Sequence, residues 1–381
     1  MPGTTLFGSS DLPIGVELHA GGVRLLQIRK SRRGLAVRGA ARVSVDDRGR
    51  PADDPLLIDE LAQAVAKGID VGRFSGRRIV LGLDGRMVRT RSVRQPRVST
   101  DEMDKAARLD APSRLGFADC EGCEIGWFRA GEVRQGDEIR DELIYVGARR
   151  EPLERLLTAL SDRGLMPSAV EPAYTALARS ETRTLRRASD ENVSRVLVDV
   201  GEQITEVMVT RGRAVAFYKQ VELGGRAMTK LACDRLGLDA ATVGDLRRRR
   251  MTHVGAAAID QKVDRALFDA VRPLINDLSQ EVTLCLRYFS VTFRGSKPEM
   301  ALVSGSEAGE PQLAHAIGES LHIPASVSRP LDGLDLSRVE KSIDCGGAGM
   351  SDWGACFGLS TRALEQATAR KDRAWKARAA A

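Results

Sequence analysis

The sequence predicts a two-lobed α/β fold in which one structural unit is duplicated. Two segments, 14–43 and 196–221, share one plan: an apolar strand ending in a carboxylate, a glycine turn, a second strand and, after another turn, a third strand. Helical patterns follow each of these antiparallel meanders. The 381 residues also exceed what a single hydrophobic core usually fills. Duplication therefore organises the whole chain.

The predicted lobes meet at a short, charged and apolar-poor connection, 180–192, which suits a surface segment. A piece with its own mixed pattern interrupts the first lobe, and it is expected to form a small inserted α+β subdomain. The tail is rich in alanine and arginine, which predicts a frayed helix or disorder. The expected boundaries are 12–190 for the first lobe, about 84–142 for the insert within it, 191–364 for the second lobe and 365–381 for the basic tail.

Helical spacing of apolar residues predicts two helices in the first lobe. Leu56–Val65 is expected to close at Gly68, and Glu151–Leu160 has a proline in its first turn and a glycine stop after it. Two apolar runs, Ile79–Leu83 and Leu143–Val146, are expected as strands of the first lobe's sheet. The helix and strand between them would belong to the insert.

The second lobe repeats the alternation of sheet and helix. Its long helix has an apolar residue every three or four positions, so one face must be buried. The expected elements after the meander are helices at Gly225–Leu236, Asp264–Phe289 and Gln312–Leu321, and strands at Met300–Val303 and Ala325–Val327.

Composition excludes several classes of protein. Hydrophobic residues make up 43% of the chain and charged residues 29%, which is ordinary for a globular protein. No stretch approaches the roughly eighteen apolar residues of a spanning helix, and the first residues show no secretory signal, so we expect a cytoplasmic protein without direct membrane insertion. The net charge of +6 is spread widely, and the basic spots at 247–250 and after 362 lack interleaved aromatic residues, so no nucleic-acid partner is expected.

The six cysteines indicate a reduced protein rather than a disulfide scaffold. Cys233, Cys285 and Cys356 lie in apolar periodic stretches and are expected as small core residues. Cys120 and Cys123 form an isolated CxxC pair, for which no second pair or nearby histidine pair supplies the remaining ligands of a closed zinc site. The role of this pair is left open.

The duplicated lobes resemble the actin, sugar kinase and heat-shock ATPase superfamily, whose ribonuclease H-like lobes each open with strand, carboxylate and glycine turn. Within it the sequence is similar to the PilM family of type IV pilus assembly proteins, with FtsA as a more distant relative. The resemblance covers about Leu12 to Leu364 and rests on five segments in the family's order. These segments are 163–179, 198–205, 221–238, 278–289 and 302–327.

The resemblance implies ATP with Mg²⁺ in the cleft between the lobes, held by the glycine turns. Glycine permits positive φ and lets backbone amides approach phosphate oxygens, while carboxylates hold the hydrated metal. Glu17 and Asp199 are the implied metal ligands, facing each other across the cleft. The implied cofactor-binding residues are Glu17, His19, Ala20, Gly21, Gly22, Asp199, Gly201, Gln203, Thr205, Gly224, Gly225, Gly305 and Ser306.

The first of these turns departs from the family pattern. Glu17, His19 and Ala20 stand where the family has Asp, Gly and hydroxyl residues, and Ser306 replaces the second glycine of the later loop. Catalysis depends on the position of metal and water, so no catalytic residue and no enzyme activity beyond a weak ATPase are expected. Two alternatives remain for the loops: a nucleotide site, or ordinary turn glycines without a ligand. His19 could contact phosphate as a cation, and Glu202 is expected to face solvent.

The function implied by the resemblance is an assembly platform at the inner face of the cytoplasmic membrane. It would bind the cytoplasmic N-terminal peptide of a PilN-like membrane protein and so attach to the membrane through its partner, with room for self-association. An extended peptide can pair with an exposed strand edge. The groove expected for it lies between the first lobe and the insert, around Ile79–Leu83, Ile125–Phe128 and Leu143–Val146.

Two other functions are compatible with the superfamily. An FtsA-like filament former would dock on the membrane with its own C-terminal helix, but the tail lacks the large apolar residues that interfacial binding needs. A sugar or acetate kinase would need a catalytic carboxylate beside the first loops, and no motif for it is present.

Overall fold

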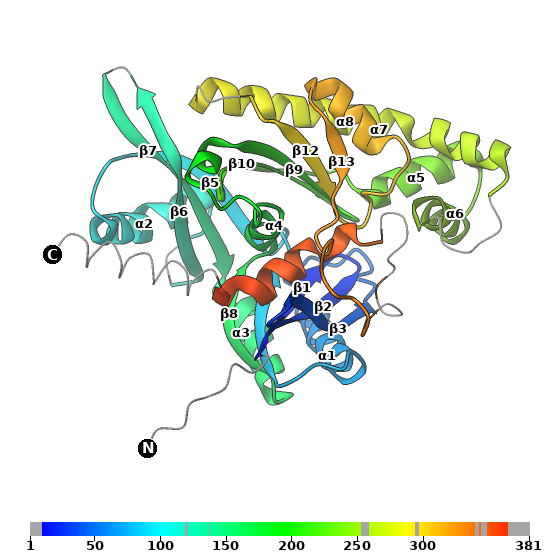
Figure 1. The fold of residues 1–381 in the computed structure, drawn as a ribbon, viewed down its shortest axis with the longest axis horizontal. Helices are drawn as coiled ribbons and strands as arrows, with labels where there is room; N and C mark the ends of the chain where they lie inside the picture. Colours follow the sequence, from blue (N-terminus) through cyan, green and yellow to red (C-terminus); the bar gives the residue numbers. More distant parts are fainter. Residues whose placement is uncertain are drawn as a thin grey trace.

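The computed structural model describes residues 10–118, 121–135, 137–252, 259–293, 297–339, 343 and 349–364. Within these ranges the chain forms two five-stranded sheets and one three-stranded sheet. Figure 1 shows the two large sheets in separate lobes, with the small sheet standing beside the second lobe. The two large sheets have the same strand order, β3-β2-β1-β4-β8 and β11-β10-β9-β12-β13, which confirms the predicted duplication.

The first lobe is built on an antiparallel meander that continues into two parallel strands. One face of its sheet is covered by helices α1 and α3, whose apolar sides complete a buried cluster. The strands are β1 Ser10–His19, β2 Gly22–Ser31, β3 Gly34–Ser44, β4 Arg78–Leu83 and β8 Met166–Pro172, and the helices are α1 Pro55–Val71, α3 Arg150–Asp162 and α4 Ala173–Glu181.

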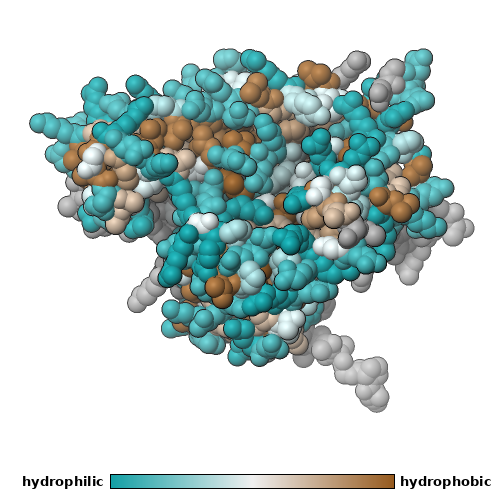
Figure 2. Space-filling model, turned by 180° about the vertical axis from the view of Figure 1, so that it is seen from behind, coloured by the Kyte–Doolittle hydropathy of each residue, from teal (hydrophilic) through white to brown (hydrophobic). Residues whose placement is uncertain are grey.

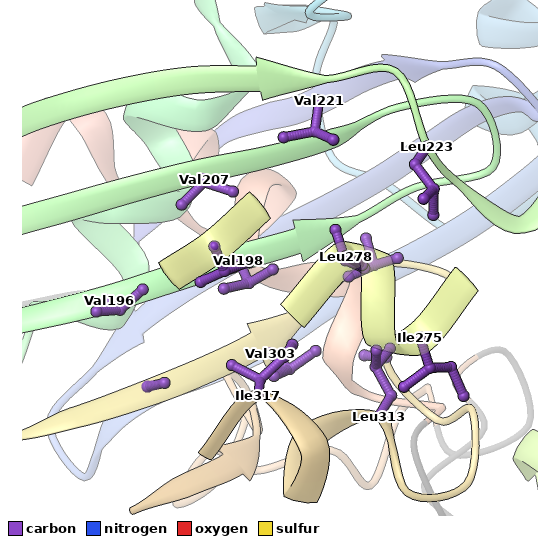
Figure 3. Packing of buried hydrophobic residues seen from close by; sticks show 14 of the residues in the cluster. Val196, Val198, Val207, Val221, Leu223, Ile275, Leu278, Val303, Leu313 and Ile317 are labelled. Carbon is purple, nitrogen blue, oxygen red and sulfur yellow. The ribbon is translucent and has the colours of Figure 1, made fainter. Parts of the chain in front are cut away.

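The second lobe repeats this plan. Figure 3 shows alternate valines of its sheet, among them Val196 and Val198, packed toward Leu278 of α7 and Ile317 of α8. The strands are β9 Ser194–Val200, β10 Thr205–Arg211, β11 Ala214–Val221, β12 Met300–Ser304 and β13 Ala325–Val327, and the helices are α5 Gly225–Leu236, α6 Ala240–Thr252, α7 Gln261–Phe293 and α8 Leu313–Leu321. A short 3-10 helix, η1 Ala188–Asn192, lies in the connection between the lobes.

The insert is a small α+β unit in which one helix covers one face of the three-stranded sheet. The sheet has the order β5-β7-β6, so β6 is an edge strand. Its elements are β5 Val88–Pro96, α2 Thr100–Leu115, β6 Cys123–Gln135 and β7 Glu138–Arg149. Leu143–Val146 therefore lies in the central strand of the insert, and the prediction that it belongs to the first lobe's sheet is wrong. Strand β8 occupies that place, because a local apolar pattern identifies a strand but not its sheet.

The end of the described chain returns to the first lobe, although the sequence placed it in the second. After the short helix η2 Ser351–Trp353, residues 354–364 are helical and lie between the lobes (red in Figure 1). Phe357 packs against Leu26 and Ile28 of the first sheet, while Ser360 Oγ accepts a hydrogen bond from the Ile28 amide at 3.0 Å. The end of the segment 191–364, which was predicted as the second lobe, therefore packs against the first sheet.

Helix α1 does not close at Gly68 as predicted. It runs on to Val71 and is capped at Gly72. A Cβ at Gly68 would lie only 2.6 Å from Leu25 Cδ1, so this glycine lets the helix approach the sheet closely. Its role is in packing rather than in chain reversal, a distinction that local sequence does not make.

The surface is mostly hydrophilic, with apolar side chains gathered in several groups on the face shown in Figure 2. Among the described residues, no helix combines the length and apolar character that crossing a bilayer requires.

Candidate functional site

The turns after β1 and β9 face each other across a cleft between the lobes. Glu17 and Asp199 hold equivalent places in the two sheets, since Glu17 pairs with Gly82 of β4 and Asp199 with Ser304 of β12. Both carboxylates line one cavity of about 60 Å³. The duplicated topology thus brings the two predicted metal ligands together.

The predicted cofactor residues fall into two groups around this cavity. Those that line it are Glu17, His19, Ala20, Asp199, Gly201, Gln203, Gly305 and Ser306. Those that do not line it are Gly21, Gly22, Thr205, Gly224 and Gly225. The cavity is also lined by charged residues that sequence reasoning missed, namely Arg24, Asp84, Arg86, Glu206 and Asp352.

A buried ion-pair chain occupies the side of the cleft beside the first turn. The Arg24 guanidinium lies 3.3 Å from Glu17 and 3.2 Å from Asp352, and all three residues are buried. Burial raises the pKa of Glu17 to about 7, against the opposing effect of Arg24 and with Asp199 and Asp352 adding to the rise. Arg24 lies directly opposite Glu17 in the hairpin of β1 and β2. Pairing the two predicted strands in the sequence could therefore have identified this ion pair.

The turn after β1 is stabilised by a hydrogen bond to one of its own side chains. His19 Nδ1 accepts a hydrogen bond from the Gly21 amide at 3.1 Å, so this nitrogen carries no proton. Burial lowers the pKa of His19 well below its usual value, aided by Arg24 and other arginines. Both effects disfavour a cationic His19, and the phosphate contact stays a prediction. Gly22 has a φ of +130°, and its Cα packs on the backbone of β3, which explains this glycine without a ligand.

The second turn is fastened to the start of α5. The Gly225 amide donates to the Gly201 carbonyl at 3.0 Å, and the Thr205 hydroxyl donates to the Leu223 carbonyl at 2.7 Å. Asp199 accepts a hydrogen bond from the Ser304 hydroxyl at 3.0 Å, and its burial raises its pKa. The Gly225 amide and the Thr205 hydroxyl, which belong to implied cofactor-binding residues, are therefore already hydrogen-bonded within the protein.

Charged side chains connect the two lobes beside the cavity. Asp47, which follows β3, accepts from Arg86 at 3.1 Å, from Arg226 of α5 at 2.7 Å and from Gln203 at 2.6 Å. Arg226 also pairs with Glu202 at 2.8 Å. These five residues, which we call the interlobe clasp, join the first lobe to the second. Glu202 lines the cavity and pairs with Arg226 while its side chain stays 35% exposed, so the expectation that it faces solvent holds only in part.

A second buried ion-pair cluster fills the space between α5, α6 and the loop after β12. Arg247 donates to the Gly225 carbonyl at 3.0 Å and to Glu307 at 2.7 Å, and it pairs with Glu310 at 2.8 Å. Arg250 pairs with the other oxygen of Glu310, also at 2.8 Å. All four charged residues are buried. The run at 247–250 is therefore only partly a surface basic spot. Arg247 and Arg250 face inward on helix α6, whereas Arg249 faces outward and pairs with Asp245.

These residues do not fit a magnesium nucleotide as they lie. Ligand pockets for small molecules usually have about 300–1,000 Å³, far more than the cavity's 60 Å³. Six carboxylates line it, from Glu17, Asp84, Asp199, Glu202, Glu206 and Asp352, against two guanidinium groups, from Arg24 and Arg86. Burial raises the pKa of Glu206 to about 8, so this carboxyl keeps a proton at pH 7, but the remaining carboxylates still outnumber the two guanidinium groups and would repel a polyphosphate.

Stability is expected to fall as the pH rises from 5 to 8, because of Glu206. Burial raises the pKa of Glu206 to about 8, with Asp199, Asp84 and Glu17 adding to the rise and the Tyr218 hydroxyl opposing it. The folded state therefore keeps a proton that the unfolded state releases near pH 4.5. Urea unfolding should show a loss on the order of 2 kcal/mol across this interval.

Glu206→Gln should remove part of that pH dependence and keep an acceptor for Tyr218, which bonds Glu206 at 2.6 Å. Glu138→Gln is the matched control, since Glu138 is exposed and pairs only with a neighbour on its own strand. Parallel pH profiles for the wild type and Glu206→Gln would contradict the assignment.

A second, larger cavity of about 940 Å³ lies between the insert and the first lobe, and residues 213–215 of the second lobe also line it. Its apolar lining comes from β6, α3 and β8, and it includes Phe128, Leu157 and Val170. Of the predicted groove, Leu83, residues 125–128 and Val146 line it, whereas residues 79–82 and 143–145 do not, and Leu143 and Tyr145 pack under α2 instead. The structure therefore contains an open groove beside an edge strand.

The structure describes one cysteine of the CxxC pair and none of the basic tail. Cys123 is buried, as are Cys285 and Cys356, while Cys120 lies outside the described residues. The tail 365–381 also lies outside them. Cys233, which was expected in the core, is only partly buried. The role of the cysteine pair stays open, and the form of the tail stays a prediction.

The duplicated sheets, the facing turns and the insert define an actin-like protein of two lobes. Its family is shown by the sequence: the chain belongs to the type IV pilus assembly protein PilM family, whose model matches residues 15–345. No curated protein matches the sequence.

Two solved structures show the same fold. A PilM–PilN type IV pilus biogenesis complex is 19% identical with a TM-score of 0.75, covering 92% of this chain and 98% of that chain. The ethanolamine utilization protein EutJ from Carboxydothermus hydrogenoformans is 10% identical with a TM-score of 0.50, covering 93% of this chain and 90% of that chain.

Proposed function

We propose that this chain is a non-enzymatic assembly platform that binds the cytoplasmic N-terminal peptide of a PilN-like membrane protein. The single observation that carries the proposal is the 940 Å³ groove beside strand β6. Membership of the pilus assembly family and the fold shared with a PilM–PilN complex support it. The platform would then reach the inner membrane through its partner.

The groove suits an extended, largely apolar peptide. Strand β6 is at the sheet edge, so its outward backbone groups can pair with an added strand. Apolar side chains of α3 and β8 form the opposite wall, among them Leu153, Leu157 and Val170. Glu171 in that wall is already held by Arg179 and Arg362, so it adds no uncompensated charge. Main-chain pairing would supply affinity, and the apolar wall would select side chains.

Replacing Gly126 with phenylalanine should abolish or strongly weaken peptide binding. Gly126 lines the groove on β6, and a Cβ built there meets no atom within 4 Å, so the new side chain enters the groove without disturbing the fold. We expect at least a tenfold rise in Kd for a synthetic partner peptide, about 1.4 kcal/mol, in fluorescence anisotropy.

Gly244→Phe on helix α6 is the matched control, because that glycine also faces open space and does not line the groove. Its Kd should equal that of the wild type. Both variants should keep the wild-type melting temperature. Unchanged affinity in a folded Gly126→Phe protein would place the peptide elsewhere.

A further inference from the structure

We propose that arginine side chains of this chain occupy the implied nucleotide site, and that the interlobe clasp holds the cleft between the lobes closed. The cleft would then be shut without nucleotide, as a fixed part of the fold. The proposal concerns the cleft alone and does not rest on the peptide partner.

The first arginine occupies the metal side of the cleft. Arg24 lies between Glu17, one of the two implied metal ligands, and Asp352, at 3.3 and 3.2 Å. Carboxylates that converge in a buried site need a positive charge to balance them. Arg24 supplies that charge from within the chain. A metal ion would compete with a guanidinium that is already desolvated and paired.

The second arginine lies in the second-lobe wall of the implied nucleotide site. Gly225, Gly305 and Ser306 were among the implied cofactor-binding residues. Arg247 and Glu307 lie beside Gly225, since Arg247 donates to the Gly225 carbonyl and to Glu307. The Glu307 carboxylate lies where a Cβ of Gly225 would be, with Oε2 at 2.7 Å from that point. The bare backbone at Gly225 is therefore covered by a side chain of this chain.

The third element is the interlobe clasp, which replaces a ligand that bridges the lobes. Asp47 is buried in the first lobe and binds Arg226 and Gln203 of the second. Glu202 reaches across in the other direction, with Oε2 lying 2.7 Å from where a Cβ of Gly21 would be. Each lobe thus contributes charged groups that the other lobe satisfies, and separation of the lobes would leave Asp47 with fewer partners.

The clasp also reaches the insert. Arg86 lies in the turn that joins β4 to β5, and it binds Asp47, Asp84 and Gln203. The position of the insert relative to both lobes is therefore fixed by the same ion pairs that close the cleft. A platform built in this way needs no nucleotide to set its shape.

The first test uses the wild-type full chain. Isothermal titration with Mg-ATP and with Mg-ADP should give no saturable binding up to about 1 mM, which is the weak end of specific affinity. Melting temperature and the radius of gyration from X-ray scattering should be the same with and without nucleotide. A micromolar Kd, or compaction of the chain on addition of nucleotide, would overturn the proposal.

The second test opens the clasp. Arg226→Met should increase the radius of gyration and speed amide hydrogen exchange in the turn at 201–204, because Asp47 and Glu202 lose their shared partner. The matched control is Arg155→Met, which breaks the exposed Arg155–Asp59 pair within the first lobe. Identical scattering and exchange for the two variants would overturn the role of the clasp, whatever the outcome of the nucleotide titration or of peptide binding.

Discussion

Arg24→Met should lower the free energy of unfolding by about 3 kcal/mol, the lower end of the range for breaking a buried ion pair. The change leaves Glu17 and Asp352 buried beside the cleft without the guanidinium that lies between them. Two effects limit the loss. Asp352 keeps Arg42 at 2.8 Å, and Glu17, whose pKa is already raised to about 7, can take up a proton. Urea denaturation at pH 7 measures the difference.

The loss should be smaller at pH 5 than at pH 8, because Glu17 is protonated at the lower pH and then needs no counter-charge. Arg114→Met is the control, since Arg114 forms only an exposed pair with Asp110 and should cost less than about 1 kcal/mol. Equal stability of the Arg24 and Arg114 variants would show that the buried chain of ion pairs does not support the fold.

Gly358→Ala should lower the free energy of unfolding by about 3 kcal/mol, the upper end of the range for overpacking a well-packed core. Gly358 lies in the helical residues 354–364, and a Cβ there would overlap the Ala176 carbonyl oxygen of α4. Backbone cannot move aside as a flexible side chain can. The two helices would have to move apart, and Phe357 and Leu359 would then lose their contacts with the first sheet.

The matched control is Gly244→Ala, which places the same methyl group on a helical glycine that faces open space. Alanine in a helix is favoured over glycine by about 0.5–1 kcal/mol, so this variant should be slightly more stable than the wild type. Thermal unfolding monitored by circular dichroism compares the two. A Gly358→Ala protein as stable as the control would mean that the end of the chain does not pack between the lobes as described.

The sequence determined the features that depend on neighbouring residues. Strand periodicity and glycine turns revealed the two meanders, and the apolar patterns located helix α5 and strand β13 with their observed bounds. The order of family segments led to the actin-like fold and the pilus assembly family, both confirmed. The family resemblance implied the groove around three segments, of which Leu83, residues 125–128 and Val146 line the observed cavity. These inferences are local or topological, so distant contacts do not alter them.

Tertiary structure alone decided which groups meet in space. The apolar run at 143–146 is a strand in either sheet, and only long-range pairing assigns it to the insert. Arg247 and Arg249 are two residues apart, yet the first is buried against Glu307 and the second pairs with exposed Asp245. Ionic partners and burial depend on residues far away in the chain, such as Asp47 beside Arg226 and Ser360 beside Ile28. For this reason the glycine turns were visible in the sequence, while the arginines that fill the cleft between them were not.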